Sequence, residues 1–204
     1  MPLAGRNANL KATSLVATTS TGNAATLAGD GLSIQINSTA RRHWDPDGLP
    51  VLYLNSTAVS SSAYTVNNVQ GKFEFASTQS TGTYTIDADY LTASAVGGGQ
   101  EWTLNVETDA FEITEFGSSG WREFQPNMSG ATASLTRFWN DETFFDYLSV
   151  GNAKFLIELI VNNSQGWRYE GFGYVTSDQI NTSVDSIVGE TVQITIDGKL
   201  YFTT

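Results

Sequence analysis

Cysteine is absent from the 204-residue chain, and histidine occurs once, as His43. The lack of cysteine excludes disulfides, thiol nucleophiles and thiolate metal sites, and with a single histidine a zinc site is nearly excluded. A Ser-His-Asp triad would have to be built around His43, yet no Gly-x-Ser-x-Gly turn accompanies it. We therefore expect His43 to be a turn or interface residue, and we predict no enzymatic activity, no bound metal and no cofactor.

Nucleotide-binding motifs are also missing. The sequence has no Walker loop, and Gly97-Gly98-Gly99 lacks the strand-to-helix context of a dinucleotide fingerprint. Residues 45–48 (Asp-Pro-Asp-Gly) resemble the start of a calcium loop, but the later ligands do not follow, so a type I turn is expected. A carboxylate pair for glycoside hydrolysis stays open as a distant alternative, because the many acids mark no particular pair.

Long apolar runs are lacking, and charged residues make up only 15% of the chain. No run approaches the roughly 18 residues of a membrane helix, and the opening residues lack the apolar core of a signal peptide. We expect a soluble protein without a membrane anchor, made in a cytoplasm. Serine, threonine and asparagine supply 59 of the 204 residues, a composition that favours strands over long surface helices.

Negative charge is concentrated in the second half of the chain. Residues 1–100 carry six acids and five bases, whereas residues 101–204 carry fifteen acids and five bases, which gives net charges of −1 and −10. Such an acidic surface repels nucleic acid and anionic membranes. Specific DNA binding by the second half is therefore not expected, and solubility alone is the simpler explanation of the acids.

The first half reads as short alternating strands separated by turns. Apolar residues alternate within residues 32–36, 51–53, 73–75 and 84–88, as in half-buried strands. Regular spacing of short strands is typical of a small sandwich or barrel. Before them, the first twelve residues read as an extended arm, and after them residues 93–99 are small and flexible enough to be a linker.

The second half shows longer strands, one irregular stretch and one hairpin signal. Residues 107–115 alternate in a way that puts acids on both faces of a strand, which does not suit burial on either side. Residues 116–128 predict a long loop whose aromatic residues argue against simple disorder. Later strands are expected over 155–161, 167–176 and 179–188. Asp197-Gly198, between runs 191–196 and 199–203, predicts a β-hairpin.

One helix is expected at about residues 140–150. Asn140 or Asp141 can act as its N-cap, and Gly151 follows as a stop signal. Phe144, Phe145 and Leu148, with Tyr147 nearby, give it a broad apolar face. The helix should therefore pack on a sheet.

Three stretches of the sequence resemble the major tail tube proteins of long-tailed, siphovirus-like bacteriophages. The first is residues 3–10 (Leu-Ala-Gly-Arg-Asn-Ala-Asn-Leu), and the second is residues 41–48 (Arg-Arg-His-Trp-Asp-Pro-Asp-Gly) followed by short strands through 64–66 and 71–75 to 90–91. The third, and most telling, is residues 115–124 (Glu-Phe-Gly-Ser-Ser-Gly-Trp-Arg-Glu-Phe), then 129–139 (Ser-Gly-Ala-Thr-Ala-Ser-Leu-Thr-Arg-Phe-Trp) and the helix. The likeness spans most of the chain and is one of pattern and order.

The resemblance implies a mainly β fold: a tail-tube-type β-sandwich or half-barrel with one flanking helix, plus a small N-terminal β-domain. We expect an N-terminal arm and possible first tube strand over 1–19, an external β-domain over 20–95 and a tube core domain over 96–204. It further implies hexameric rings, whose inner strands join in one barrel and which stack into the tube that carries DNA during ejection.

Particular residues take roles under this resemblance. Acids that would line the lumen are Glu107, Asp109, Glu112 and Glu115. Strand alternation places Glu112 opposite the other three, so not all can face inward. Residues of the ring-stacking loop would be Phe116, Trp121, Arg122 and Phe124. Residues of the N-terminal arm would be Arg6, Leu10 and Lys11.

The implied partners are other copies of the chain, the tape measure, tail-tip and terminator or connector proteins, and viral DNA that passes without specific binding. The implied location is the virion tail, after synthesis in the cytoplasm of a bacterial host. Two other functions fit the composition: a monomeric carbohydrate- or cell-surface-binding β-sandwich module, and a capsid decoration protein. The alternative explanation for the acids of residues 107–115 is that they face the outer surface and keep the protein soluble.

Overall fold

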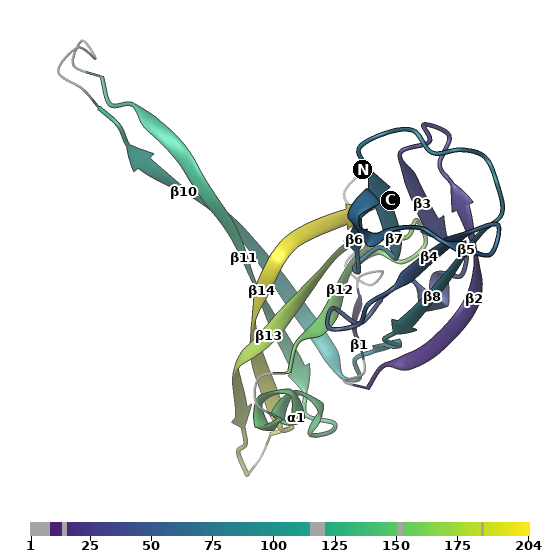
Figure 1. Cartoon of the computed structure of the whole chain (residues 1–204). Coiled ribbons are helices and arrows are strands. Elements are labelled where there is room, and N and C mark those ends of the chain that lie inside the picture. The colour runs from purple at the N-terminus through teal and green to yellow at the C-terminus, as the bar shows by residue number, and fades with distance from the viewer. Residues whose placement is uncertain (1–8, 14–15, 115–120, 151–152, 185) are drawn as a thin grey trace. The chain divides into compact units, whose positions relative to one another are not determined.

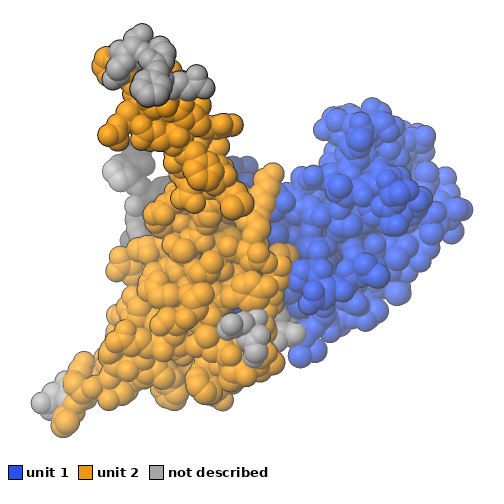
Figure 2. All heavy atoms as spheres, turned by 60° about the vertical axis from the view of Figure 1, so that its left-hand side comes forward, with its two compact units in different colours: residues 1–96, 155–170, 201–204 blue, residues 97–154, 171–200 orange. Residues whose placement is uncertain are grey.

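The computed structural model describes residues 9–13, 16–114, 121–150, 153–184 and 186–204. Over these ranges the chain is mainly β, with fourteen strands and one α-helix, which confirms the predicted fold class (Figure 1). It divides into two compact units (Figure 2). Unit 1 comprises residues 1–96, 155–170 and 201–204, and unit 2 comprises residues 97–154 and 171–200.

Seven strands of unit 1 form a sheet of their own, in the order β5-β4-β8-β2-β3-β7-β6. Their bounds are β2 Thr18–Leu27, β3 Ser33–Ile36, β4 Val51–Leu54, β5 Thr57–Ala58, β6 Tyr64–Asn67, β7 Lys72–Phe75 and β8 Tyr84–Tyr90. Alternate side chains of these strands are buried, among them Ile34, Leu52, Phe73 and Ile86, around the fully buried Trp44. The predicted short strands of the first half are thus confirmed, and they share one apolar core.

Three further strands of unit 1 belong to a second sheet. They are β1 (Asn9–Thr13), β9 (Ala93–Ala95) and β12 (Phe155–Asn162), and β1 pairs antiparallel with both of the others. The side chains of β12 are buried on both faces, as its apolar pattern predicts. The predicted linker 93–99 is wrong in its first half, because Ala93–Ala95 pairs with Ala12 and its neighbours in β1.

Four strands of that second sheet lie in unit 2 for most or all of their length, in the order β10-β11-β14-β13. Their bounds are β10 Gly99–Glu112, β11 Phe124–Phe138, β13 Trp167–Asn181 and β14 Gly189–Thr203. β14 pairs with β11 over Ala131–Phe138, where Leu135 lies opposite Val192 and both side chains are buried. β10 is an edge strand of this sheet.

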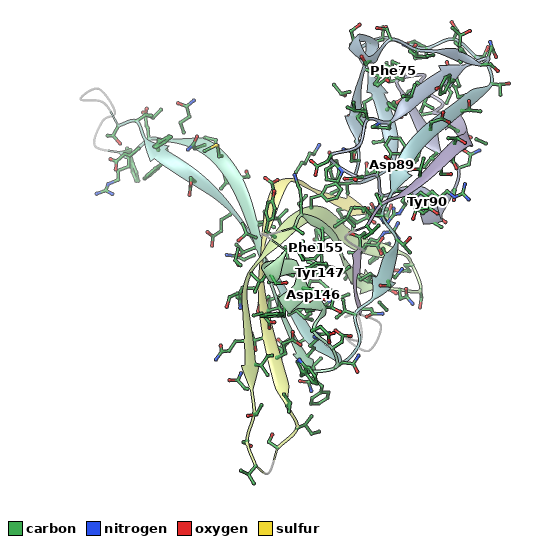
Figure 3. The ribbon with its side chains drawn as sticks, turned by 60° about the horizontal axis from the view of Figure 1, so that its bottom comes forward. Phe75, Asp89, Tyr90, Asp146, Tyr147 and Phe155 are labelled. Carbon is green, nitrogen blue, oxygen red and sulfur yellow. The ribbon has the colours of Figure 1, made fainter. Side chains whose placement is uncertain are left out.

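The helix α1 spans Thr143–Ser149 in unit 2, inside the predicted range. The N-cap residue is Glu142, so the predicted N-caps Asn140 and Asp141 lie one or two residues too early, although the Thr143 amide donates to Asp141 Oδ1 at 3.2 Å. Phe144 and Tyr147 are buried, whereas Phe145 is 58% exposed, so the apolar face is narrower than predicted. Figure 3 shows Tyr147 and its exposed neighbour Asp146 on this helix.

Two predicted chain reversals are not found. β14 runs without a break through Asp197-Gly198, where Gly198 takes a φ of +84°, so the predicted hairpin there is wrong. The two strands predicted over 167–176 and 179–188 are instead one strand, β13, that ends at Asn181. The predicted loop 116–128 is also too long, because β11 begins at Phe124.

Among the helices of the described ranges, none combines the length and apolar character needed to cross a membrane. Each predicted domain (1–19, 20–95 and 96–204) is one continuous segment of the chain. Unit 1, in contrast, also contains residues 155–170 and 201–204. Those boundaries stay a prediction about which segments fold independently.

Candidate assembly surface

The outer parts of β10 and β11 form a two-stranded ribbon in unit 2, which we define as residues 105–114 and 121–130. Glu107 lies opposite Gly130 and Phe111 opposite Gln125, while pairing of β11 with β14 begins only at Ala131. Figure 1 shows the ribbon continuing beyond the rest of its sheet. All its side chains are exposed, so neither face is covered. This explains how β10 tolerates acids on both faces.

Large apolar side chains are unusually frequent on the ribbon. They are Val106, Phe111, Ile113, Trp121, Phe124 and Met128, of which Trp121 is 80% and Met128 75% exposed. Soluble proteins rarely expose contiguous apolar patches unless these bind another molecule, and a two-stranded hairpin is at best marginally stable in water. The ribbon therefore has the properties of a binding surface.

Two of the four predicted lumen acids share a hollow at the base of the ribbon. Glu107 and Asp109 line it together with Asn105 from β10, with Met128 and residues 130–132 of β11, and with Thr195 and Ile196 of β14. Asn105 Nδ2 donates to Glu107 Oε1. A β-bulge lies between Thr108 and Ala110, yet Glu107 and Asp109 still face the same side.

The remaining predicted residues on the ribbon lie closer to its tip. Glu112 Oε2 is 3.8 Å from Nη1 of Arg122, and its Oε1 accepts from the Thr114 hydroxyl. Phe124 is the first residue of β11 and lies opposite Glu112, and Trp121 precedes it. Glu115 and Phe116 lie outside the described residues. Which of these side chains face a lumen or a neighbouring ring stays a prediction.

The residues predicted for the N-terminal arm divide differently. Leu10 and Lys11 lie in β1, within a sheet of unit 1, and not in a free arm. Leu10 is buried, and Lys11 Nζ is 3.5 Å from Glu158 Oε2. Their position agrees with the alternative of a first strand in 1–19. Arg6 lies outside the described residues.

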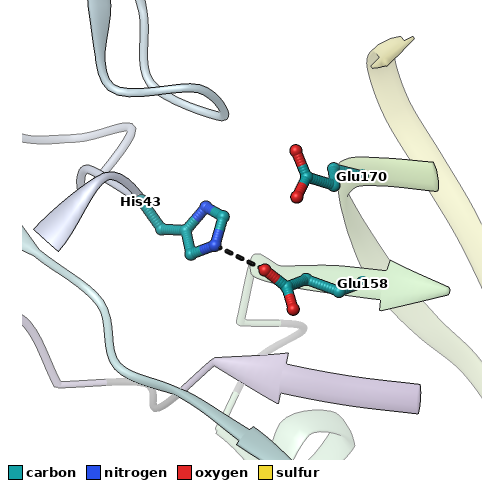
Figure 4. Close-up of side chains that lie close together, drawn as sticks. All are labelled: His43, Glu158 and Glu170. Atoms are coloured by element: carbon teal, nitrogen blue, oxygen red, sulfur yellow. Dashed lines mark hydrogen bonds and ion pairs between the residues drawn. The ribbon is translucent and has the colours of Figure 1, made fainter. Parts of the chain in front are cut away.

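A buried cluster of charged side chains in unit 1 was not predicted from the sequence. His43 Nε2 lies 2.8 Å from Glu158 Oε1 (Figure 4). Its Nδ1 lies 2.8 Å from the Val69 carbonyl oxygen. Arg42 Nη2 donates to Glu158 Oε1 at 2.7 Å and also to Glu170 Oε1. All four charged or titratable side chains are buried. We call them the Glu158 cluster.

The cluster is held by further partners. Arg168 Nε donates to Glu170 Oε1, and the Thr203 hydroxyl donates to Glu170 Oε2 at 3.0 Å. Gly71 allows the chain to approach Arg42 closely, because it has a φ of +62° and a Cβ there would come within 2.4 Å of the Arg42 carbonyl oxygen. The cluster thus ties the segment at 42–43 to β12 and β13 within unit 1.

The charges in this cluster balance without an added ion. His43, Glu158 and Glu170 offer three ligand-type atoms within 4.8 Å of one another, which a metal could use. Arg42 and Arg168 already neutralise the two carboxylates, however, so the arrangement is that of a buried ion-pair network. Burial raises the pKa of Glu158, but hydrogen bonds from His43 and Arg42 outweigh it and hold that pKa well below its usual range.

Unit 2 contains a buried ion pair between Arg137 and Glu190. Arg137, fully buried, donates through Nε and Nη2 to the carboxylate of Glu190 and through Nη2 to the Asp141 carbonyl at 2.8 Å. Its guanidinium also lies 4.8 Å from the Phe144 ring centroid. Burial raises the pKa of Glu190, Arg137 opposes this, and the nearby Asp178 adds to the rise. These contacts join β11, β14 and the start of α1.

No known family profile matches the sequence, and no curated protein matches it. Among solved structures, the chain is similar to a protein in the tail of an empty gene transfer agent particle, with C6 symmetry (18% identity, TM-score 0.48, covering 55% of this chain and 87% of that one). It is also similar to one in the virion of a native gene transfer agent particle (17% identity, TM-score 0.47, 55% and 89%). At this level of similarity neither match decides what the chain does.

Proposed function

We propose that the chain is a structural subunit of a phage-type tail, whose copies form rings that stack into the tail tube. The ribbon carries this proposal. It exposes apolar side chains on both faces, lies at the edge of a sheet, and includes residues 121–124 and 129–130, which belong to stretches that resemble tail tube proteins. In a polymer, neighbouring copies would cover this surface.

Exposed strand edges support the same proposal. An edge strand offers unpaired backbone groups that favour association with another chain. β10, fourteen residues long, is such an edge and reaches to the ribbon. In a closed ring of six copies the β10 edge of each copy would be paired by its neighbour.

We propose that acids make the channel of the tube repel DNA. Glu107 and Asp109 lie side by side in an open hollow, where carboxylates facing a channel would repel phosphates and keep DNA from binding. Six copies would carry a formal charge of 6 × −11 = −66. We propose that DNA passes during ejection without specific contacts.

The wider assembly follows from the tube role. We propose that tape measure, tail-tip and terminator or connector proteins bind the polymer, and that the chain is made in the cytoplasm of a bacterial host and ends in the virion tail. The role is structural, and it requires neither catalysis nor a cofactor.

Negative-stain electron microscopy of the concentrated purified protein, with light scattering alongside, tests the proposal. Rings or hollow tubes of uniform width are the expected result. A monodisperse monomer that stays monomeric with tail-tip proteins added, and that binds glycans in a screen, would overturn it and favour the carbohydrate-binding alternative.

A further inference from the structure

Unit 2 exposes a second group of large apolar side chains, apart from the ribbon. Members of this group, which we call the base patch, are Phe138, Trp139, Phe145, Val150 and Ile187. The Trp139 amide donates to the Val188 carbonyl oxygen at 3.0 Å, and Phe138 lies opposite Gly189. The end of β11 and the start of β14 therefore meet there, and Arg137 joins both to the segment just before α1 through Glu190 and the Asp141 carbonyl oxygen.

The base patch and the outer ribbon lie at different ends of unit 2. Figure 1 and Figure 3 both show α1 well separated from the far end of the β10–β11 ribbon. We call the apolar residues nearest that end, Phe111, Trp121 and Phe124, the tip patch. They are all at least half exposed, as are Phe145, Val150 and Ile187 of the base patch. One unit thus carries two separate apolar surfaces that it does not cover itself.

We propose that the tip patch of one copy binds the base patch of the next copy along the tube. This inference rests on the proposed function and names the surface that receives the ribbon. Contact between two different patches of identical chains is heterologous and repeats without closing, so it builds a filament. A single tip-to-base contact, repeated, covers both patches in every copy.

The charged residues favour contact between a tip patch and a base patch over contact between two base patches. Residues 138–150 contain three acids, Asp141, Glu142 and Asp146, but no lysine or arginine. Two base patches facing each other would therefore repel. The ribbon carries four acids, Glu107, Asp109, Glu112 and Glu123, and one cation, Arg122, whose side chain is 75% exposed and whose Nη1 lies 3.8 Å from Glu112 Oε2. Arg122 can pair with a base acid when tip meets base. Two tips in contact would leave every base patch exposed.

The composition of the tip fits a contact that holds a polymer together. Tryptophan, phenylalanine and arginine are enriched at the energetic centres of protein interfaces, where they fill pockets and exclude water. Trp121, Arg122 and Phe124 lie together where β11 begins. The base patch supplies the apolar aromatic and aliphatic groups against which they would pack.

Engineered cysteines test the contact directly, since the chain has none of its own. Glu123→Cys lies beside the tip patch and Ser149→Cys beside the base patch, and both positions are exposed. Tubes of the double variant, treated with a short bis-maleimide, should give a ladder of covalent oligomers on a denaturing gel. Tubes assembled from a mixture of the two single variants should give dimers that contain one of each.

The outcomes separate this inference from the proposed function. Tubes that yield no ladder, or that yield dimers only from Glu123→Cys alone, would overturn the tip-to-base contact and leave the tube role standing. Absence of rings and tubes in the unmodified protein, even with tail-tip proteins added, would overturn both.

A substitution gives a second readout. Val150→Asp should raise the protein concentration needed for tubes by about tenfold or more, because it adds an unpaired charge to the contact. Leu49→Asp, at a 92% exposed position of unit 1, is the matched control and should assemble as the unmodified protein does. Circular dichroism checks that both variants fold. Equal assembly of Val150→Asp and the control would count against the base patch.

Discussion

His43 Nε2 lies 2.8 Å from Glu158 Oε1 although 115 positions separate the two residues in the chain. Both side chains are buried, and Arg42 approaches the same carboxylate oxygen at 2.7 Å. One carboxylate in β12 therefore receives two donors from the segment that follows Arg41, and so fixes that segment on β12 within unit 1.

Removing the carboxylate should destabilise the fold strongly. In Glu158→Ala, Arg42 loses one partner and His43 its only side-chain partner among the described residues, both in a buried site. Breaking a buried ion pair on one side typically costs about 3–5 kcal/mol of unfolding free energy. Lys72→Ala, which removes the partly exposed pair with Glu74 at 3.0 Å, should cost about 1 kcal/mol or less. Urea unfolding of both variants measures the difference, and equal losses would contradict the role of the cluster.

Stability should fall in acid through Glu158. A carboxyl group whose pKa is lowered by folding contributes stability above its unfolded pKa of about 4.3, and this is lost as pH falls toward the folded value. Glu190 has a raised pKa and acts in the opposite sense, contributing stability at low pH that is lost as pH rises through its folded value. In urea titrations at several pH values, Glu158→Gln should flatten the acid decline and Glu190→Gln should steepen it. The same slope in both variants would disprove these assignments.

Gly198 should resist substitution because of its backbone angle. Gly198 and Gly189 both lie in β14 with no atom within 4 Å of an added Cβ, but only Gly198 has a positive φ, +84°. Gly198→Ala should therefore lower the unfolding free energy by about 1–3 kcal/mol. Gly189→Ala should leave it within about 1 kcal/mol. Thermal or urea unfolding compares them, and equal effects would mean that β14 bends in another way.

Deleting the end of the ribbon should separate folding from assembly. Without residues 117–124 we expect a folded, soluble protein that forms no tubes, because the cores of both units lie elsewhere. Circular dichroism and electron microscopy follow the two properties. Loss of folding, or normal tubes, would each count against the ribbon as an assembly element.

Reversing the charge of the hollow should affect DNA passage alone. Glu107→Lys with Asp109→Lys should leave tube formation intact and slow genome ejection, because lysine binds phosphate. A matched change of charge at the exposed Asp30 and Asp47 of unit 1, each to lysine, is the control. Ejection timed by release of a DNA-bound dye from whole particles would show the difference; unchanged kinetics would remove these acids from the channel wall.

Local patterns predicted much of this fold. A nearly continuous apolar run located β12, and capping residues with an apolar face located α1 to within a few residues. Tertiary pairing overrode local signals elsewhere. Asp197-Gly198 has the sequence of a hairpin turn, but the strand continues through it, and the small residues Ala93–Ala95 became a strand because β1 offered an open edge.

The charged clusters could not be predicted from the sequence, for a different reason. Arg42 lies 116 positions from Glu158 and 128 from Glu170, and no local pattern joins residues so far apart. One signal was available: a glutamate in the middle of a strand that is apolar on both faces requires a buried cation or donor. For the ribbon the signal was stronger, since acids on both faces of 107–115 already excluded burial.

The place of β1 between β12 and β9 imposes an order on folding. Residues 9–13 emerge from the ribosome well before β12, which lies about 145 positions later, so this pairing closes a very long loop. The sheet formed by residues 18–90 has all its partners within one contiguous segment, and it can fold while the rest is still being made. Newly made chains therefore wait with β1 unpaired on its β12 side. A chaperone that shields apolar strands would find its target there, at Leu10 and Ala12.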